Sequence, residues 1–148
     1  MNVAVGSDHA GFELKAAILE VVGREGHAAL DLGTHGTAAV DYPDIARAVG
    51  ESIRAGGAER GVLVCGSGVG VSIAANKLRG IRAAICHDHY SAHQGVEHDD
   101  MNVLVLGSRV IGVKLAEDLV KAFVGANFTN EERHKRRLAK VKALEDQR

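Results

Sequence analysis

Five short aliphatic runs alternate along this chain with segments of helical periodicity, and this alternation restricts the possible folds more than any other feature. The aliphatic runs, which predict strands, are Asn2–Gly6, Ala28–Leu32, Gly61–Cys65, Arg82–Cys86 and Asn102–Leu106. Apolar residues at helical spacing predict helices over Ala10–Arg24, from Pro43 to about Gly56, and over Val69–Leu78, Ser91–Glu97 and Ile111–Ala122. Such alternation predicts a parallel sheet covered on both faces through right-handed crossovers. We therefore expect an α/β fold, a Rossmann-like three-layer sandwich with a five-stranded parallel sheet.

The end of the chain differs in character from the rest. Thr129-Asn130-Glu131-Glu132 has the pattern of a helix capping box, and a basic segment follows it. Only a thin apolar stripe of Leu138, Val141 and Leu144 runs along that segment. A helix with so little apolar surface is not expected to bury itself deeply in its own subunit. We therefore expect a single domain over residues 1–148, in which 129–148 form an extra C-terminal helix that packs on a partner subunit.

Composition restricts the class of protein and its partners. The chain has 148 residues, of which 46% are hydrophobic and 25% charged, as is usual for a soluble globular domain. A net charge of −1 argues against attraction to nucleic acid or membrane surfaces. Two cysteines are too few for a disulfide framework and suit a reducing compartment. We expect a soluble, cytoplasmic protein with neither nucleic acid nor a membrane as partner.

Polar and ionisable residues follow each of the five predicted strands. They are Ser7-Asp8-His9, Gly33-Thr34-His35, Cys65-Gly66-Ser67-Gly68, His87-Asp88-His89 and Gly107-Ser108-Arg109. In open parallel sheets, ligands bind outside the carboxyl ends of the strands, where these segments would meet. The sequence therefore predicts a ligand site at this edge of the sheet.

The glycine-rich segment after the third strand is the most informative of these. Glycines between a buried strand and a helix let backbone amides converge on an anion. The spacing G-x-G-x-G differs from the dinucleotide pattern G-x-G-x-x-G, and the lysine of a P-loop is absent. Cys65 stands where a helix dipole and free amides stabilise a thiolate. The pattern alone leaves open whether Cys65 is reactive or, like Cys86, a small buried residue.

Three further groups have alternative interpretations. Asp8 could cap the helix after it or bind a ligand. His89 and His93 have a spacing that can hold zinc, but no accompanying ligand pattern supports it, so no metal site is predicted. The cations of Arg133–Arg137 could form a solvated basic face or a phosphate site.

Together, these segments identify the chain as similar to a known family. The matching segments, in order, are 7–15 (SDHAGFELK), 31–36 (DLGTHG), 41–46 (DYPDIA), 65–77 (CGSGVGVSIAANK), 80–84 (GIRAA), 97–112 (EHDDMNVLVLGSRVIG) and 132–137 (ERHKRR). They span almost the whole chain and resemble the B type of ribose-5-phosphate isomerase, in a group with galactose-6-phosphate and allose-6-phosphate isomerases. Each segment is ordinary alone, but their combination in this order is specific.

The resemblance implies a role for each matching residue. Cys65 matches the base that moves a proton between C1 and C2 of an open-chain aldose, and Ser67 matches a hydroxyl beside it. His98 matches the residue that opens the furanose ring, and Asp8 a ligand of sugar hydroxyls. The amides that match the anion hole belong to Gly66, Gly68, Val69 and Gly70. The positions that match phosphate ligands are His9, Arg109, Arg133, His134 and Arg137.

The resemblance also implies no cofactor, a sugar phosphate as substrate, a place in the pentose phosphate pathway, and a homodimer, possibly a tetramer, with composite sites. Some relatives lack the cysteine and use a glutamate at the position of Val71, which leaves Cys65 as the base in this loop. Many relatives have asparagine where this chain has Asp99. The change affects the sugar preference more than the reaction, so another hexose or tetrose phosphate stays an alternative substrate, and a non-catalytic sugar-phosphate or nucleotide module is the alternative outside enzymes.

Overall fold

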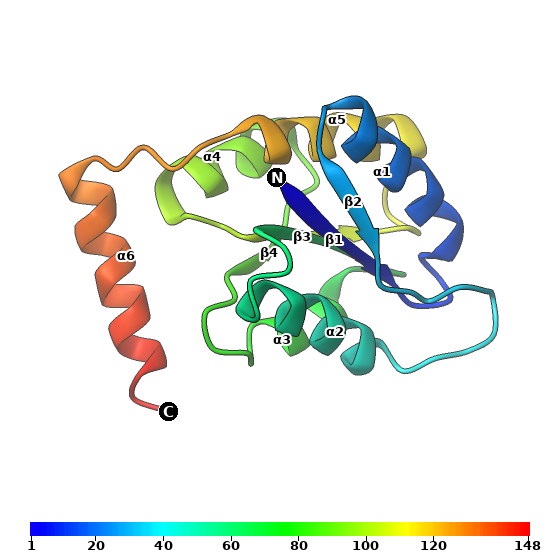
Figure 1. Ribbon diagram of the computed structural model, residues 1–148, viewed down its shortest axis with the longest axis horizontal. Coiled ribbons are helices and arrows are strands. Elements are labelled where there is room, and N and C mark those ends of the chain that lie inside the picture. The colour runs from blue at the N-terminus through cyan, green and yellow to red at the C-terminus, as the bar shows by residue number, and fades with distance from the viewer.

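A computed structural model describes all residues from Met1 to Arg148, and it contains five strands and six helices. The strands are β1 (Asn2–Ser7), β2 (Ala28–Asp31), β3 (Arg60–Cys65), β4 (Ala83–Ile85) and β5 (Val103–Gly107). The helices are α1 (Phe12–Arg24), α2 (Tyr42–Arg54), α3 (Val69–Ala75), α4 (His89–Asp99), α5 (Val113–Gly125) and α6 (Glu132–Glu145). The predicted alternation of strands and helices is confirmed (Figure 1).

The five strands form one parallel sheet in the order β2-β1-β3-β5-β4. The chain starts near the middle of the sheet, at β1, and reaches both edges, which is the arrangement of a doubly wound fold. The register places Cys65 at the end of β3 beside Gly107 at the end of β5. The carboxyl ends of the two central strands therefore meet at one edge of the sheet.

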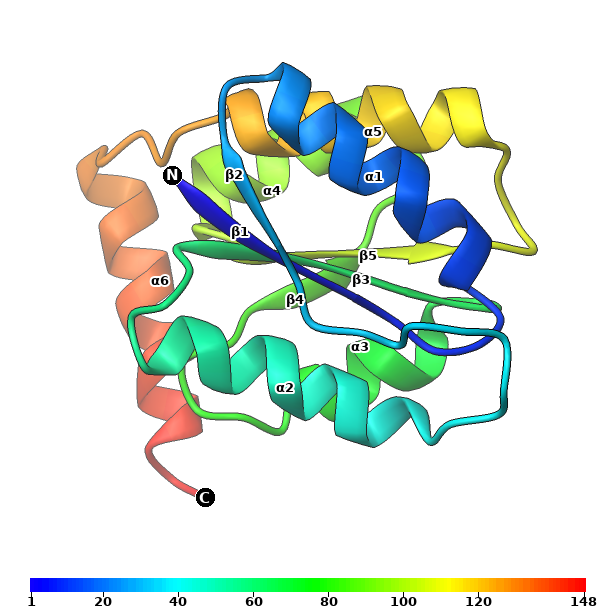
Figure 2. The same ribbon diagram turned by 45° about the vertical axis from the view of Figure 1, so that its right-hand side comes forward.

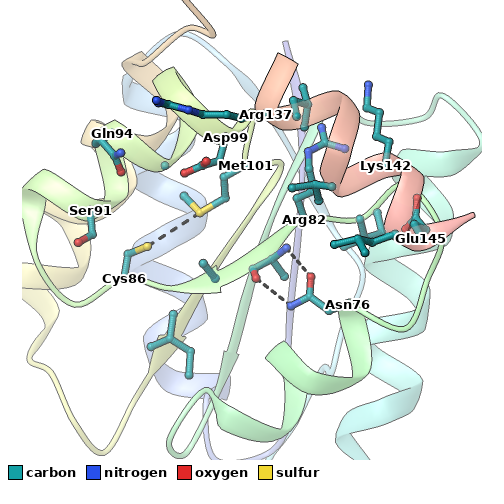
Figure 3. A pocket seen from close by; sticks show the side chains of 18 of the residues that line it. Asn76, Arg82, Cys86, Ser91, Gln94, Asp99, Met101, Arg137, Lys142 and Glu145 are labelled. Atoms are coloured by element: carbon teal, nitrogen blue, oxygen red, sulfur yellow. Dashed lines mark hydrogen bonds between the residues drawn. The ribbon is translucent and has the colours of Figure 1, made fainter. Parts of the chain in front are cut away.

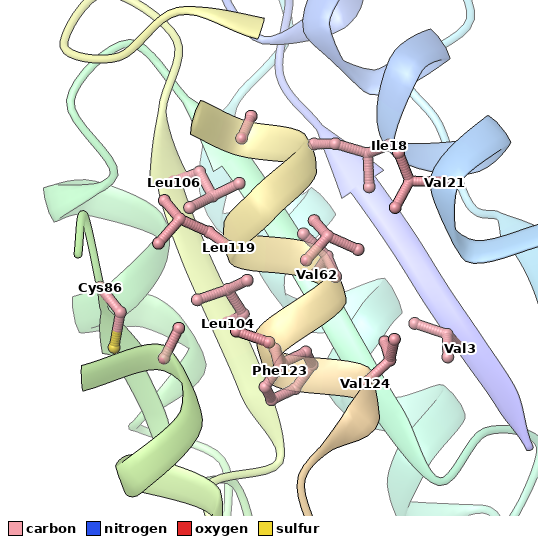
Figure 4. Close-up of a cluster of buried hydrophobic side chains, with 14 of the residues drawn as sticks. Val3, Ile18, Val21, Val62, Cys86, Leu104, Leu106, Leu119, Phe123 and Val124 are labelled. Atoms are coloured by element: carbon pink, nitrogen blue, oxygen red, sulfur yellow. The ribbon is translucent and has the colours of Figure 1, made fainter. Parts of the chain in front are cut away.

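Helices cover both faces of the sheet and give it two apolar cores (Figure 2). Helices α1, α4 and α5 pack on one face, where Phe123 and Leu119 are fully buried against Leu104 (Figure 4). Helices α2 and α3 pack on the other face. Successive strand residues point to opposite faces, so Val64 enters the first core and Cys65 the second. The predicted three-layer sandwich is confirmed.

The boundaries of several helices differ from those expected, and α5 (Val113–Gly125) begins two residues and ends three residues later than predicted. Helix α1 begins at Phe12 because the Asp8 carboxylate accepts the amides of Ala10 and Gly11 in a turn, at 3.0 and 3.1 Å. Helix α3 ends at Ala75, three residues early, because the side chain of Asn76 pairs with both backbone groups of Ala83 on β4.

Helix α4 is longer than expected and begins at His89. The Asp88 carboxylate accepts the amide of Ser91 at 2.7 Å, and this hydrogen bond lowers the pKa of Asp88. The added residues at the other end, His98 and Asp99, fall in the last turn of the helix. The two residues that the resemblance singles out on this segment are therefore held by helical backbone.

The C-terminal helix α6 stands beside the end of the sheet where the strands begin (Figure 2). Leu138 is buried, whereas Val141 and Leu144 are 51% and 65% exposed, as the thin apolar stripe indicated. The expected capping box is wrong, because Glu131 is the N-cap without a side-chain cap, and the Thr129 hydroxyl instead binds the Glu131 amide and the His134 ring. None of the helices combines the length and apolar character needed to cross a membrane.

Candidate active site

Cys65 lies at the bottom of a pocket at the carboxyl edge of the sheet. Its side chain is 5% exposed, and its sulfur accepts a hydrogen bond from the Gly68 amide at 3.1 Å. The pocket has a volume of about 370 Å³. Its lining residues come from the ends of β1, β3 and β5 with the loops that follow them, and from the starts of α2 and α3: Asp8, His9, Ala10, Tyr42, Cys65, Gly66, Ser67, Gly70, Arg109 and Val110. A thiol from the second apolar core therefore meets a pocket that the ionisable side chains of Asp8, His9 and Arg109 also line.

The loop after β3 wraps around this sulfur because its glycines permit a tight path. Gly68 has a φ of +86°, in the left-handed region, and a side chain there would press against Val105 and Leu106. A Cβ on Gly70 would lie 2.8 Å from the ring of Tyr42. The amides of Ser67 and Gly70 donate to no acceptor within the chain. They can therefore bind an oxyanion beside the thiol.

Ser67 lies on the exposed rim of the loop. Its hydroxyl accepts the Val69 amide at 3.1 Å, so it supports the first turn of α3. The same hydroxyl still carries a proton that it can donate to a bound ligand. Ser67 therefore stabilises the loop and can contact a ligand at the same time.

Asp8 and His9 form the side of the pocket that follows β1. One carboxylate oxygen of Asp8 is used in the turn before α1. The expectation that Asp8 could cap the helix is wrong, because the N-cap is Gly11 and no side chain caps it, whereas Asp8 does line the pocket. Nδ1 of His9 accepts the Val40 amide at 3.2 Å. This hydrogen bond leaves Nε2 as the protonated nitrogen, which can donate to an anion.

Arg109 provides the one guanidinium of the pocket lining. The loop that carries it is held by backbone bonds from Ser108 to Cys65 and from Arg109 to Gly66, at 2.8 and 3.0 Å. The side chain passes next to Gly66, where a Cβ would lie 3.4 Å from Nη1, and it forms no ion pair within the chain. Arg109 and His9 can therefore both hold an anionic group.

A second group of predicted site residues lies on α4 and α6. The rings of His98 and His134 stack, with centroids 4.1 Å apart and planes inclined by 26°. Asp99 and Arg137 both line a groove of about 660 Å³ between α4, α6 and β4 (Figure 3). Arg133 pairs with Glu131 at 3.0 Å on the exposed surface of α6. These five residues, His98, Asp99, Arg133, His134 and Arg137, form what we call the α4–α6 group.

The α4–α6 group lies near the amino ends of the strands, whereas Cys65 lies at their carboxyl ends. Helix α4 starts beside the carboxyl end of β4 and runs back, so its last turn is close to the amino end of β5. His98 comes five residues before Val103, whereas Cys65 lies beside Gly107 at the other end of that strand. Five strand residues alone span about 13 Å. One chain therefore brings together Asp8, His9, Cys65, its loop and Arg109, but not the α4–α6 group.

The sequence did not identify Tyr42, Gln94 or Thr129 as site residues, and it indicated Thr129 only as part of a capping box. Tyr42 is 43% exposed in the Cys65 pocket, and its place before Pro43 at the start of α2 puts it at the ligand edge. Gln94 lies 2.8 Å from the ring of His98, at a spacing of i, i+4 that could have predicted the contact. Thr129 contacts His134 only because the chain after α5 bends toward α4, which no local pattern indicates.

Comparison with known proteins places this geometry in context. Residues 3–141 match the family model described as Ribose/Galactose Isomerase. Ribose-5-phosphate isomerase B of Escherichia coli is 42% identical over 147 residues, which cover 99% of this chain and 98% of that protein. The structure of Clostridium thermocellum ribose-5-phosphate isomerase B is 44% identical, with a TM-score of 0.95 and 99% of both chains covered.

A further solved structure carries a ligand. It is Mycoplasma genitalium ribose-5-phosphate isomerase B with bound ribulose-5-phosphate, which is 36% identical, with a TM-score of 0.92. The comparison covers 99% of this chain and 97% of that one. The similarity therefore extends over the Cys65 pocket and the α4–α6 group alike.

Proposed function

The chain belongs to the ribose/galactose isomerase family, and we propose that it interconverts ribose 5-phosphate and ribulose 5-phosphate with Cys65 as the base. The observation that carries the proposal is the position of the Cys65 sulfur. It lies at the bottom of a pocket, with free backbone amides on one side and two side chains that can donate hydrogen bonds to an anion, His9 and Arg109, in the lining. A base, an oxyanion site and an anion-binding rim are the three parts that this reaction requires.

The reaction moves one proton between neighbouring carbons. The Cys65 thiolate takes the proton from C2 of the open-chain aldose, the electrons of that bond form the C1–C2 double bond, and O1 becomes negatively charged. The loop amides stabilise this enediolate, and one such donor contributes about 3–4 kcal/mol. The thiol then returns the proton to C1, while the hydroxyl proton moves from O2 to O1. The Cys65 thiolate is regenerated in this step, and no step uses a metal or a redox cofactor.

The substrate phosphate orients C2 against the sulfur from a distance. His9 and Arg109 are placed to bind it, because they line the same pocket and can both donate hydrogen bonds to its oxygens. Binding energy gained at the phosphate offsets the entropy of ordering an open chain. Asp8, also in the lining, can accept hydrogen bonds from the sugar hydroxyls.

We further propose that the complete site forms between two copies of the chain. Ring opening by His98 and phosphate binding by Arg133 and Arg137 require the α4–α6 group near Cys65, yet the fold holds them at opposite edges of the sheet. A homodimer in which each copy places its α4–α6 group over its partner's Cys65 pocket satisfies both demands. The exposed Val141 and Leu144 on α6 offer apolar surface for that contact.

An exchange measurement tests the proposed function. In D2O, we expect loss of the C2 proton signal of ribose 5-phosphate and appearance of ribulose 5-phosphate by NMR, faster than for allose 6-phosphate, galactose 6-phosphate or a tetrose phosphate. Faster exchange of another sugar phosphate would reassign the substrate and keep the chemistry. Binding of these phosphates without any exchange would instead indicate a non-catalytic binding module.

We expect His98→Asn to affect the cyclic substrate far more than an open chain. Ring opening moves the O1 proton through His98 to the ring oxygen as the C1–O4 bond breaks, and such acid–base help contributes about 100-fold or more. Conversion of ribose 5-phosphate should fall by roughly that factor. Ribulose 5-phosphate has no hydroxyl placed to close a five-membered ring, so exchange of its C1 proton into D2O should stay within about threefold. Equal losses in both measurements would remove the ring-opening role.

A further inference from the structure

His134 is buried behind His98 and is not free to act as a surface cation. It is 1% exposed, although both neighbours on α6, Arg133 and Lys135, are exposed. One face of its ring lies against the ring of His98 at 4.1 Å. A phosphate ligand needs a nitrogen that reaches substrate, whereas this ring is enclosed between α4 and α6.

Both rings of the pair have one nitrogen engaged by a neighbour. Nδ1 of His98 lies 2.8 Å from the side-chain nitrogen of Gln94, one turn earlier on α4. Nδ1 of His134 lies 2.5 Å from the hydroxyl of Thr129. Thr129 is itself tied to α4, because its amide donates to the Glu97 carbonyl at 3.0 Å. The contacts fix the plane of the His98 ring and leave Nε2 as its only free nitrogen.

The charges around the pair keep His134 neutral. Burial lowers the pKa of His134 most, and His98, Arg133 and Arg137 lower it further, while Glu131 opposes them. Because the group titrates below its ordinary range, it carries no proton on its second nitrogen at neutral pH. His98 therefore stacks on an uncharged ring, and the pair does not hold two positive charges in contact.

We propose that His134 and Gln94 are positioning residues for ring opening, which hold His98 so that Nε2 faces the substrate, and that His134 does not bind phosphate. The proposal rests on the proposed function and deepens it. The contacts of His134 and Gln94 with His98 serve the ring-opening step alone, since neither residue lines the Cys65 pocket. Proton transfer between C1 and C2 on an already open chain should therefore not depend on them.

Substitution of Gln94 gives the cleaner test, because this side chain is only half buried and its loss should not unfold the protein. In Gln94→Leu, we expect kcat for ribose 5-phosphate to fall by about 10- to 100-fold with little change in KM. Exchange of the C1 proton of ribulose 5-phosphate should stay close to that of the unchanged protein. His93→Ala, on the same helix but paired with Glu97 instead, is the matched control and should alter neither.

Two further variants distinguish positioning from a structural role. Gln94→Glu places a carboxylate on Nδ1, which favours the charged ring, so the acid limb of the pH–rate profile for ribose 5-phosphate should move to higher pH. His134→Phe keeps the stacked ring and should retain more ribose 5-phosphate activity than His134→Ala. A rise in KM without a change in kcat for both His134 variants would instead identify a phosphate ligand.

The outcomes separate this proposal from the proposed function. Equal loss of ribose 5-phosphate conversion and ribulose 5-phosphate exchange in Gln94→Leu, with an unmoved pH profile in Gln94→Glu, overturns the positioning role while the isomerase assignment stands. If the unchanged protein neither converts ribose 5-phosphate nor exchanges the C1 proton of ribulose 5-phosphate, the proposed function itself fails.

Discussion

Replacing Cys65 with alanine is expected to reduce the isomerisation of ribose 5-phosphate by several orders of magnitude. The glycine loop offers no second base, because Val71, the position of the alternative glutamate base, is a fully buried aliphatic residue. Each tenfold loss corresponds to about 1.4 kcal/mol of activation free energy. The C1 proton exchange of ribulose 5-phosphate should fall together with the overall reaction, because both steps use the same base.

The fold should survive this substitution. Alanine removes only the sulfur, which leaves the Gly68 amide without its acceptor at the bottom of a pocket that opens to the surface. An unsatisfied buried donor costs about 1–3 kcal/mol, and access to water reduces that cost. Thermal unfolding followed by circular dichroism should therefore show a cooperative transition at a slightly lower temperature.

Cys86→Ala is the matched control for a buried cysteine. Its sulfur lies in the first core, 3.9 Å from the sulfur of Met101. Burial, with the nearby Asp88, raises the pKa of Cys86 to about 11, so this thiol stays protonated at neutral pH. The variant should isomerise ribose 5-phosphate at close to the original rate. Turnover near the original rate in Cys65→Ala, or a comparable loss in Cys86→Ala, would contradict the assignment of the base.

The fold could be predicted from local patterns because each strand is a compact aliphatic run and each helix has one apolar face. The exact ends of the helices could not be predicted in this way, because they depend on hydrogen bonds from side chains to backbone groups, some of which belong to other elements. Asn76 ends α3 through Ala83 on β4, and the two positions form this contact only in the folded sheet. The capping box predicted at Thr129 does not form for a similar reason, because the Thr129 hydroxyl binds the His134 ring.

The Cys65 pocket could be predicted more fully than the rest of the site. The carboxyl ends of parallel strands meet wherever the chain alternates strand and helix, so Asp8, Cys65 and Arg109 had to converge. The position of the α4–α6 group could not be predicted in the same way, because His98 and Arg137 lie on separate helices near the amino ends of the strands. A resemblance gave these residues roles, but only the fold shows that one chain does not unite them with Cys65.

A mixing experiment addresses this separation. Two variants are required, Cys65→Ala and a double variant, His98→Asn with Arg137→Ala, each damaged in a different half of the proposed site. Refolded separately, each should have little activity on ribose 5-phosphate. Refolded together in equal amounts, the two chains should form mixed dimers. In these, one pocket combines the intact Cys65 of the double variant with the intact α4–α6 group of the other chain.

The activity of this refolded mixture tests directly whether two chains share one active site. If the site is shared between two copies, random pairing leaves about a quarter of all sites intact, and the mixture should recover about that fraction of the original activity on ribose 5-phosphate. The two variants refolded apart and then combined at the assay serve as the control. A refolded mixture no more active than that control would contradict an active site built from Cys65 of one chain and His98 and Arg137 of another.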